Sequence, residues 1–340
     1  MTVPPAAVSN PVSVADRWLQ KLPGLALVAA IALVATLTQR LTGIAALSPL
    51  IVALGIGIGY RRVLGKATVL DAGIAFALRP VLRFAIILLG LQITLMEVAI
   101  LGWRGVIAVI LTLVTSFFFT KAVARLFGVE RGLAELIAAG TAVCGASAII
   151  ACNTVTRGSD EDVAYAMACV TLFGTVAMLI FPLVAGPLQL SASAYGMWAG
   201  TSIHEVGQVV GASFAVGEES GHMAAVAKLT RVILLAPLIL TLGFLRNRGG
   251  STAVRVPMPW FVFGFIGMMV LNTIVALPEP LHDFLVLTTA FLLTGALAAM
   301  GLETDLKKLR QKGGGPLALG ASASVFISAV GLVLTLWASR

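Results

Sequence analysis

The sequence predicts an all-α, polytopic membrane protein with about eleven transmembrane helices, and three observations lead to this fold class. Hydrophobic residues make up 59% of the 340 residues and charged residues only 11%, whereas a soluble domain carries about 25% charged residues because water must wet its surface. The mean hydropathy is +1.02. The apolar residues also fall into long runs, and no polar stretch between them is long enough to form a soluble domain.

These apolar runs set the expected spans, because a helix needs about 20 apolar residues to cross a bilayer. We predict spans near residues 22–38, 44–60, 80–96, 105–121, 132–153, 162–184, 194–212, 223–245, 259–276, 281–301 and 316–338. The segment 67–78 is apolar but short and contains Asp71, which predicts an interfacial or re-entrant helix. Residues 1–21 are predicted to be a cytoplasmic segment, and residues 22–338 a single transmembrane domain embedded in the lipid bilayer.

The distribution of basic residues predicts the orientation of the chain. The net charge of +8 would suggest nucleic-acid binding in a soluble protein, but here the basic residues lie in short loops, so no nucleic-acid partner is expected. The loops that follow even-numbered spans contain Arg61, Arg62, Lys66, Arg79, Lys121, Arg125, Arg131, Arg246, Arg248, Arg255, Lys307, Lys308, Arg310 and Lys312. Cytoplasmic loops carry the excess of Lys and Arg, which predicts a cytoplasmic N-terminus and a periplasmic or extracellular C-terminus.

Two short segments indicate an internal repeat. Residues 90–95 (GLQITL) end the third span and residues 301–306 (GLETDL) end the tenth, with three identities at six positions. The two spans are an odd number apart, so they run in opposite directions. Inverted repeats of this kind are typical of secondary transporters; the alternative is a chance match.

The fifth span is rich in small residues and is predicted to be broken. Gly140 and Gly145 lie inside this span with small residues between them, and glycine weakens a helix. A half-helix that starts near Cys144 would direct its backbone N–H groups and the positive end of its dipole at an anion. Cys144, Gly145 and Ser147 are therefore candidate binding residues, and Asn153 at the end of the span is a candidate exit residue. The alternatives are close helix packing for the small residues and a polar cap for Asn153.

A second broken helix is predicted in the seventh span. Ser202 and Glu205 have the spacing of a capping box, which implies an unwound stretch near Gly200. This arrangement places His204, Glu205 and Gln208 at mid-membrane, with His204 and Gln208 on one face. An ionisable group at the bilayer centre costs roughly 2.5–3.5 kcal/mol, so a functional site is expected there; a purely structural polar cluster is the alternative.

Two cations in the eighth span could complete this site. Lys228 and Arg231 are three residues apart and share a helix face. They are expected either to pair with Glu205 or to bind an anionic substrate, with His204 or Glu205 taking a coupling proton. Lys228 could alternatively extend to the membrane surface.

Neither an enzyme nor a metal site is expected. His204-Glu205 begins like the HExxH motif of zinc proteases, but Gln208 occupies the position of the second histidine, and a zinc site needs at least three converging ligands. Cys144, Cys152 and Cys169 have no metal-ligand spacing. Cys144 and His204 form the one plausible nucleophile pair of an intramembrane enzyme. No cofactor is expected.

Four segments carry a family resemblance. Residues 83–91, 140–149, 198–205 and 228–232 resemble the YeiH family of bacterial inner-membrane proteins, also designated UPF0324, whose suggested activity is sulfate export. The resemblance implies membership of the superfamily of cation:proton antiporters and anion transporters. It also implies that superfamily's fold, in which scaffold and core subdomains are interleaved and two broken helices cross at mid-membrane.

The expected function is therefore secondary active transport of a small anion, such as sulfate or an organosulfur-derived anion, exported with H⁺ or Na⁺ as coupling ion. The alternative within the same fold is a cation:proton antiporter, with Glu205 as ion ligand and Arg231 as structural counter-charge. A channel is a further alternative, although no segment resembles a selectivity filter. A homodimer is left open.

Overall fold

The computed structural model describes residues 18–42, 48–65, 67–246, 259–275, 277–304 and 313–340, and these residues form helices and no strand. Residues 1–17 of the predicted cytoplasmic segment 1–21 lie outside the described residues. Residues 305 and 306, which end the second repeat segment, and several of the basic loops lie outside them as well. Seven of the described helical segments are long and apolar enough to cross a membrane. They are Leu22–Leu41, Thr68–Gln92, Val98–Val123, Asp160–Ala185, Glu218–Leu245, Glu279–Glu303 and Gly314–Ala338.

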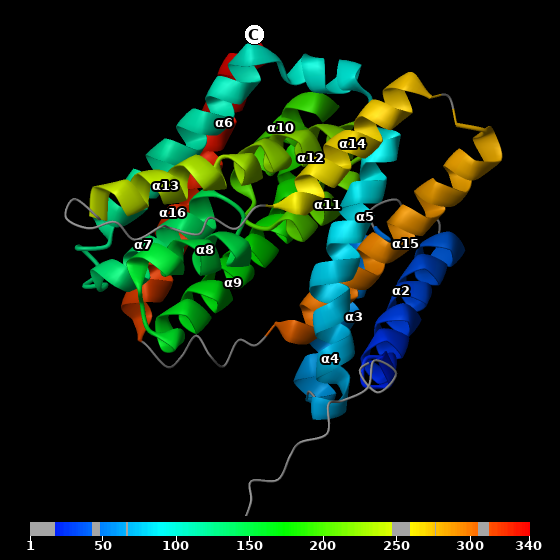
Figure 1. Cartoon of the computed structure of the whole chain (residues 1–340), viewed down its shortest axis with the longest axis horizontal. Coiled ribbons are helices and arrows are strands. Elements are labelled where there is room, and N and C mark those ends of the chain that lie inside the picture. Colours follow the sequence, from blue (N-terminus) through cyan, green and yellow to red (C-terminus); the bar gives the residue numbers. More distant parts are fainter. Residues whose placement is uncertain (1–17, 43–47, 66, 247–258, 276, 305–312) are drawn as a thin grey trace, which may run out of the picture.

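The helices pack as two groups, which lie side by side in Figure 1. The peripheral group consists of α2 (Leu22–Thr42), α3 (Pro49–Leu64), α4 (Thr68–Phe76), η1 (Ala77–Val81), α5 (Leu82–Leu89), η2 (Gly90–Gln92), α14 (Trp260–Ile274) and α15 (Glu279–Glu303). The central group consists of α6 (Leu95–Val123), α7 (Arg131–Ala142), α8 (Ala146–Thr156), α9 (Asp160–Ala185), α10 (Ala192–Ser202), α11 (Val206–Phe214), α12 (Glu218–Ile233), α13 (Leu235–Arg246) and α16 (Gly314–Ala338). The chain passes from one group to the other several times, so the groups are interleaved in sequence.

The separate interfacial helix predicted over residues 67–78 is not observed. Helices α4, η1, α5 and η2 follow one another without interruption from Thr68 to Gln92. Pro80 lies inside η1, which is a π-helical turn. A wider turn of this kind absorbs the missing N–H and the bulk of the proline ring, which would otherwise break the helix. The prediction was wrong because it treated the proline as a helix start.

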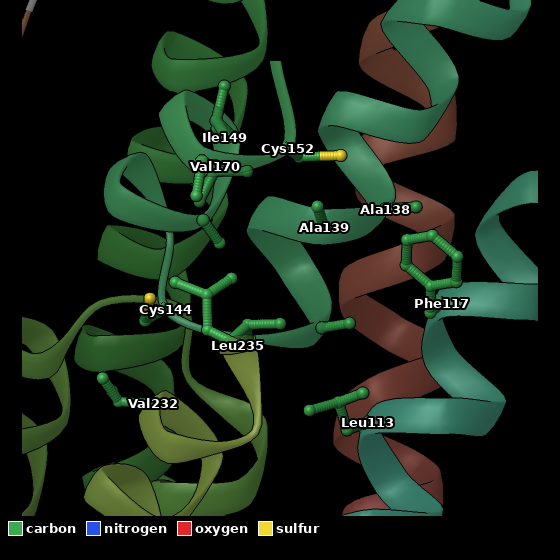
Figure 2. Packing of buried hydrophobic residues seen from close by; sticks show 14 of the residues in the cluster. Leu113, Phe117, Ala138, Ala139, Cys144, Ile149, Cys152, Val170, Val232 and Leu235 are labelled. Atoms are coloured by element: carbon green, nitrogen blue, oxygen red, sulfur yellow. The ribbon is translucent and has the colours of Figure 1, made fainter. Parts of the chain in front are cut away.

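Small and aliphatic side chains fill the centre of the central group. Figure 2 shows Ala138 of α7 on the side that faces Phe117 of α6, while Ile149 of α8 and Val170 of α9 lie on the other side. All four are buried, and each is at most 2% exposed. Because α7 carries little side-chain bulk, three neighbouring helices approach it closely. This packing positions the interruption at the end of α7.

The peripheral group depends on one close contact between α3 and α15. A Cβ atom on Gly57 would lie 2.5 Å from the carbonyl oxygen of Ala298 and 3.0 Å from the Cα atom of Gly301. We expect Gly57→Ala to force the two helices apart and lower the free energy of unfolding by about 1–3 kcal/mol. Thermal unfolding of the detergent-solubilised protein measures this change.

Gly59→Ala is the matched control, because Gly59 lies on the same helix and a Cβ there would meet nothing within 4 Å. This substitution should be neutral, or stabilising by up to about 1 kcal/mol through helix propensity. Equal effects of the two substitutions would show that the contact between α3 and α15 is not tight.

Candidate functional site

Three-residue linkers join α7 to α8 and α10 to α11 in the central group, and these two breaks meet. Helix α7 ends at Ala142 and α8 begins at Ala146, which confirms the break predicted near Cys144. Helix α10 ends at Ser202 and α11 begins at Val206. The second break therefore lies three residues beyond the predicted position near Gly200. Ser202 is the last residue of α10 and does not cap a helix start; Glu205 takes the N-cap position of α11, with Gln208 at the third helical position.

Arg231 of α12 joins the carboxyl-terminal ends of both interrupted helices. Its side chain is 0% exposed, and its guanidinium donates five hydrogen bonds, all to backbone carbonyl oxygens next to the two breaks. The acceptors are Thr141 (2.7 Å), Ala142 (3.0 Å), Gly200 (3.3 Å), Thr201 (2.7 Å) and Ile203 (3.2 Å). The last carbonyls of a helix have no partner within the helix and carry a partial negative charge. The buried guanidinium of Arg231 gives these carbonyls both hydrogen-bond donors and a balancing positive charge.

Lys228, one turn before Arg231, completes this arrangement. Its ammonium donates to the carbonyl oxygens of Val143 at 2.8 Å and Ile203 at 2.7 Å, and its side chain is also 0% exposed. The pair with Glu205, one of the two arrangements expected for these cations, is not formed; both cations donate to backbone carbonyls instead. The sequence placed Lys228 and Arg231 on one face correctly, but it did not identify their partners.

The amino-terminal ends of α8 and α11 converge on the Glu205 carboxylate. The backbone N–H of Ala146 donates to this carboxylate, and the Thr171 hydroxyl of α9 donates to its Oε1 at 3.3 Å. Gly145 lies directly against the Glu205 side chain and has φ +72°, a conformation that favours glycine. Glu205 is partly exposed, unlike the two cations. The two breaks therefore have a positive, buried side and an acidic, accessible side.

Gln208 and His204 do not share a face, contrary to expectation. Gln208 lies in α11, where its Oε1 accepts the Glu205 N–H at 3.1 Å and its Nε2 donates to the Thr171 carbonyl at 3.1 Å. His204 lies in the linker before α11, and its Nε2 is 3.0 Å from the Ser324 hydroxyl of α16. His204 is 1% exposed, and its Nδ1 has no hydrogen-bond partner. The prediction was wrong because it assumed that residue 204 was helical.

The remaining candidates lie around the first break. Cys144 is buried in the linker between α7 and α8, whereas Ser147 is exposed in the first turn of α8. Asn153 accepts the Gly158 N–H at 2.7 Å, which closes the turn after α8; its predicted place along an exit stays a prediction. Among the described residues, no group of His, Cys, Asp and Glu is arranged to hold a metal ion.

The sequence reasoning did not select three residues that contribute to the site. Thr171 and Ser324 are single hydroxyl residues within apolar helices, and their polarity was the available signal. Arg79, in η1 of the peripheral group, is exposed, and its charge acts on the Glu205 carboxylate. The sequence places Arg79 among the loop cations, whereas in the structure residues 68–92 form one continuous helical segment that includes it.

Known proteins resemble the chain over nearly its whole length. The family described as conserved hypothetical protein 698 matches residues 23–320. A UPF0324 membrane protein of Pseudomonas putida is 37% identical over 328 residues, which cover 93% of each chain. One of Listeria monocytogenes is 34% identical over 92% of this chain and 94% of its own. One of Bordetella pertussis is 36% identical over 89% of this chain and 91% of its own.

No solved structure matches the chain. The family match and the relatives agree with the resemblance found in the sequence, and the long apolar helices agree with a membrane location. The chain therefore belongs to the UPF0324 family of membrane proteins.

Proposed function

We propose that the protein is a secondary active transporter of a small anion such as sulfate or an organosulfur-derived anion. The observation that carries this proposal is the polarity of the two breaks. Lys228 and Arg231 bind the carbonyl ends of α7 and α10, so those ends carry their own counter-charge. The amino ends of α8 and α11 are directed at a partly exposed position, and helix amino ends bind anions through their N–H groups and dipoles.

The proposed architecture has eleven membrane crossings. The seven long helices supply seven, α3 and α14 supply two, and the interrupted pairs α7–α8 and α10–α11 supply the other two. The N-terminus is cytoplasmic in this arrangement, within a bacterial inner membrane. The peripheral group acts as scaffold and the central group as the moving core. In support of an inverted repeat, both repeat segments end helices of the peripheral group, and the helices that follow them, α6 and α16, pack on each other.

The substrate contacts are proposed at the amino ends of the half-helices. Ser147 and the backbone of Cys144 and Gly145 lie at the start of α8, and Glu205 lies at the start of α11, where the Thr171 hydroxyl of α9 donates to its carboxylate. Lys228 and Arg231 act as positioning residues that hold the two breaks together. Ser202, His204, Gln208 and Asn153 support the same backbone. Alternating access then exposes these amino ends to one side of the membrane at a time.

A charge added to the first turn of α8 tests this proposal. Ser147 is exposed there, so Ser147→Asp adds a negative charge that opposes an anion at the helix amino end. We expect the variant to lose at least about tenfold in uptake of labelled sulfate into proteoliposomes, from like-charge repulsion near a helix terminus. Ser147→Asn, which has nearly the same shape and no charge, is the control and should retain uptake. Equal uptake by the two variants would contradict an anion site at this position.

A cation:proton antiporter is the second candidate, because Glu205 places a carboxylate at the meeting point of the two breaks. Such an exchanger would move Na⁺ or K⁺ against a pH gradient and would tolerate the added carboxylate of Ser147→Asp. A pH-sensitive dye inside the proteoliposomes distinguishes the two functions. Proton movement that depends on Na⁺ or K⁺ and not on sulfate would favour the antiporter.

A further inference from the structure

We infer that Glu205 is the proton-coupling residue, and that its carboxylate occupies the anion position until a proton releases it. This inference rests on the proposed anion transport. In the structure Glu205 provides the negative charge at the amino ends of α8 and α11. A substrate anion needs the same N–H groups, so the carboxylate and the substrate compete. Protonation of Glu205 removes its charge and lets the substrate take its place, so that the anion and the proton move together.

The contacts of Glu205 are those expected of a bound anion. The Ala146 N–H at the start of α8 and the Thr171 hydroxyl of α9 both donate to its carboxylate. The residue also occupies the N-cap position of α11. Three separate elements therefore contribute to one carboxylate site, and two of them are positive ends of helix dipoles.

The Glu205 side chain also packs directly against the backbone at the start of α8. Even a single Cβ atom on Gly145 would overlap the Glu205 side chain, with the carboxylate Oε1 3.0 Å away. The side chain must therefore leave the start of α8 before a substrate binds there. Glu205 is partly exposed, whereas Lys228 and Arg231 are fully buried, so the carboxylate is the most accessible of these three groups to a proton.

His204 fits this role less well, although it lies next to Glu205. It is 1% exposed, its Nε2 is held by Ser324, and the charges of both Lys228 and Arg231 act on it. A proton on His204 would add a third positive charge to a buried region that already contains two. A proton on Glu205 instead neutralises a charge at the accessible side.

Charged and polar groups near Glu205 influence the exchange of its carboxylate for the substrate anion. Lys228 on α12 and Arg79 on η1 are the cations whose charges act on the carboxylate, and the Cys144 thiol in the linker is the neighbouring group that Glu205 affects in turn. Thr171 on α9 is uncharged. Arg79 is exposed, so its charge also acts on an anion that replaces the carboxylate.

The test measures sulfate binding to the full-length purified protein at a series of pH values. Sulfate keeps the same charge throughout the neutral range, so any pH dependence belongs to the protein. For the wild type we expect the apparent Kd to weaken by about tenfold for each pH unit once Glu205 has lost its proton, as one exchanged proton requires. Glu205→Gln cannot ionise and should bind with a Kd that does not vary with pH. Glu205→Asp keeps a carboxylate and should retain the dependence.

The outcomes separate this inference from the proposed function. Sulfate binding that shows the same pH dependence in Glu205→Gln as in the wild type would overturn the inference and leave the anion transporter intact. A pH-independent Kd in the wild type would overturn it without any variant, so the test stands even if Glu205→Gln fails to fold. Absence of sulfate binding in the wild type at every pH would contradict the proposed function and the inference together. In proteoliposomes, a pH gradient should drive sulfate uptake by the wild type but not by Glu205→Gln.

Discussion

Arg231→Ala is expected to destabilise the protein more than any other single substitution in the core. The side chain is 0% exposed and donates five hydrogen bonds to carbonyl oxygens at both breaks. Its removal leaves several of these oxygens buried without a donor, and each such group costs about 1–3 kcal/mol. We expect a loss of at least about 4 kcal/mol in the free energy of unfolding, seen as a fall of about 10 °C in the melting temperature of the detergent-solubilised protein.

Two other substitutions show whether this loss comes from the hydrogen bonds. Arg231→Lys keeps the charge but lacks the planar fork of donors, so it should recover only part of the lost stability. Arg125→Ala removes an exposed arginine and should change stability by no more than about 0.5 kcal/mol. If Arg231→Ala were as stable as Arg125→Ala, the carbonyl ends of α7 and α10 would not depend on the buried guanidinium.

Gly145→Ala is expected to abolish transport while the overall fold survives. Gly145 has φ +72°, and a methyl group on it would collide with the Glu205 side chain. The backbone conformation alone, with φ +72° and ψ −130°, costs an alanine about 1–3 kcal/mol, and the forced displacement of Glu205 adds about 1–3 kcal/mol. Because Glu205 can no longer return to the start of α8, its carboxylate and the substrate can no longer exchange there, so proton-coupled sulfate uptake should fall together with the stability. Uptake and thermal unfolding of the same preparation measure both effects.

Gly128→Ala separates the backbone strain from the collision. Gly128 has a similar φ of +65°, but a Cβ there meets nothing within 4 Å. The substitution should cost only the backbone strain of about 1–2 kcal/mol and leave transport unchanged. If both glycine variants transported sulfate normally, the contact between Gly145 and Glu205 would have no role in the transport cycle.

Local sequence signals predicted the interrupted helices but located only one of them correctly. The small residues between Gly140 and Ser147 weaken a helix wherever it lies in the fold, so the first break was found within two residues. In the seventh span, the sequence favours Ser202 as the N-cap because serine is a preferred capping residue, but the structure has Glu205 at the N-cap with Gln208 at the third helical position. The carbonyls of Gly200 and Thr201 bind Arg231, a contact from another helix that stabilises the end of α10 and decides between the two positions.

The roles of the charged residues could not be predicted in the same way. The spacing of Lys228 and Arg231 places them on one face of an apolar segment. Binding of an anion, pairing with Glu205 and a structural role are all compatible with that placement. Their acceptors lie between 25 and 90 residues away in the chain. No local pattern specifies a contact with a backbone carbonyl at that separation, because every residue has a carbonyl and only the fold brings a particular one near.

By itself, the sequence determined that this chain is a helical membrane protein with polar residues and helix breaks inside its apolar segments. Composition and hydrophobic run length are local quantities, and the lipid environment acts on each segment separately. Only the tertiary structure decided that the cations bind the carbonyl ends and that Glu205 occupies the amino ends. This separation of the positive and negative side chains depends on where α8, α9, α11 and α12 meet. The charges of helix ends act on a side chain only at close range, so the separation is a property of the assembled helices.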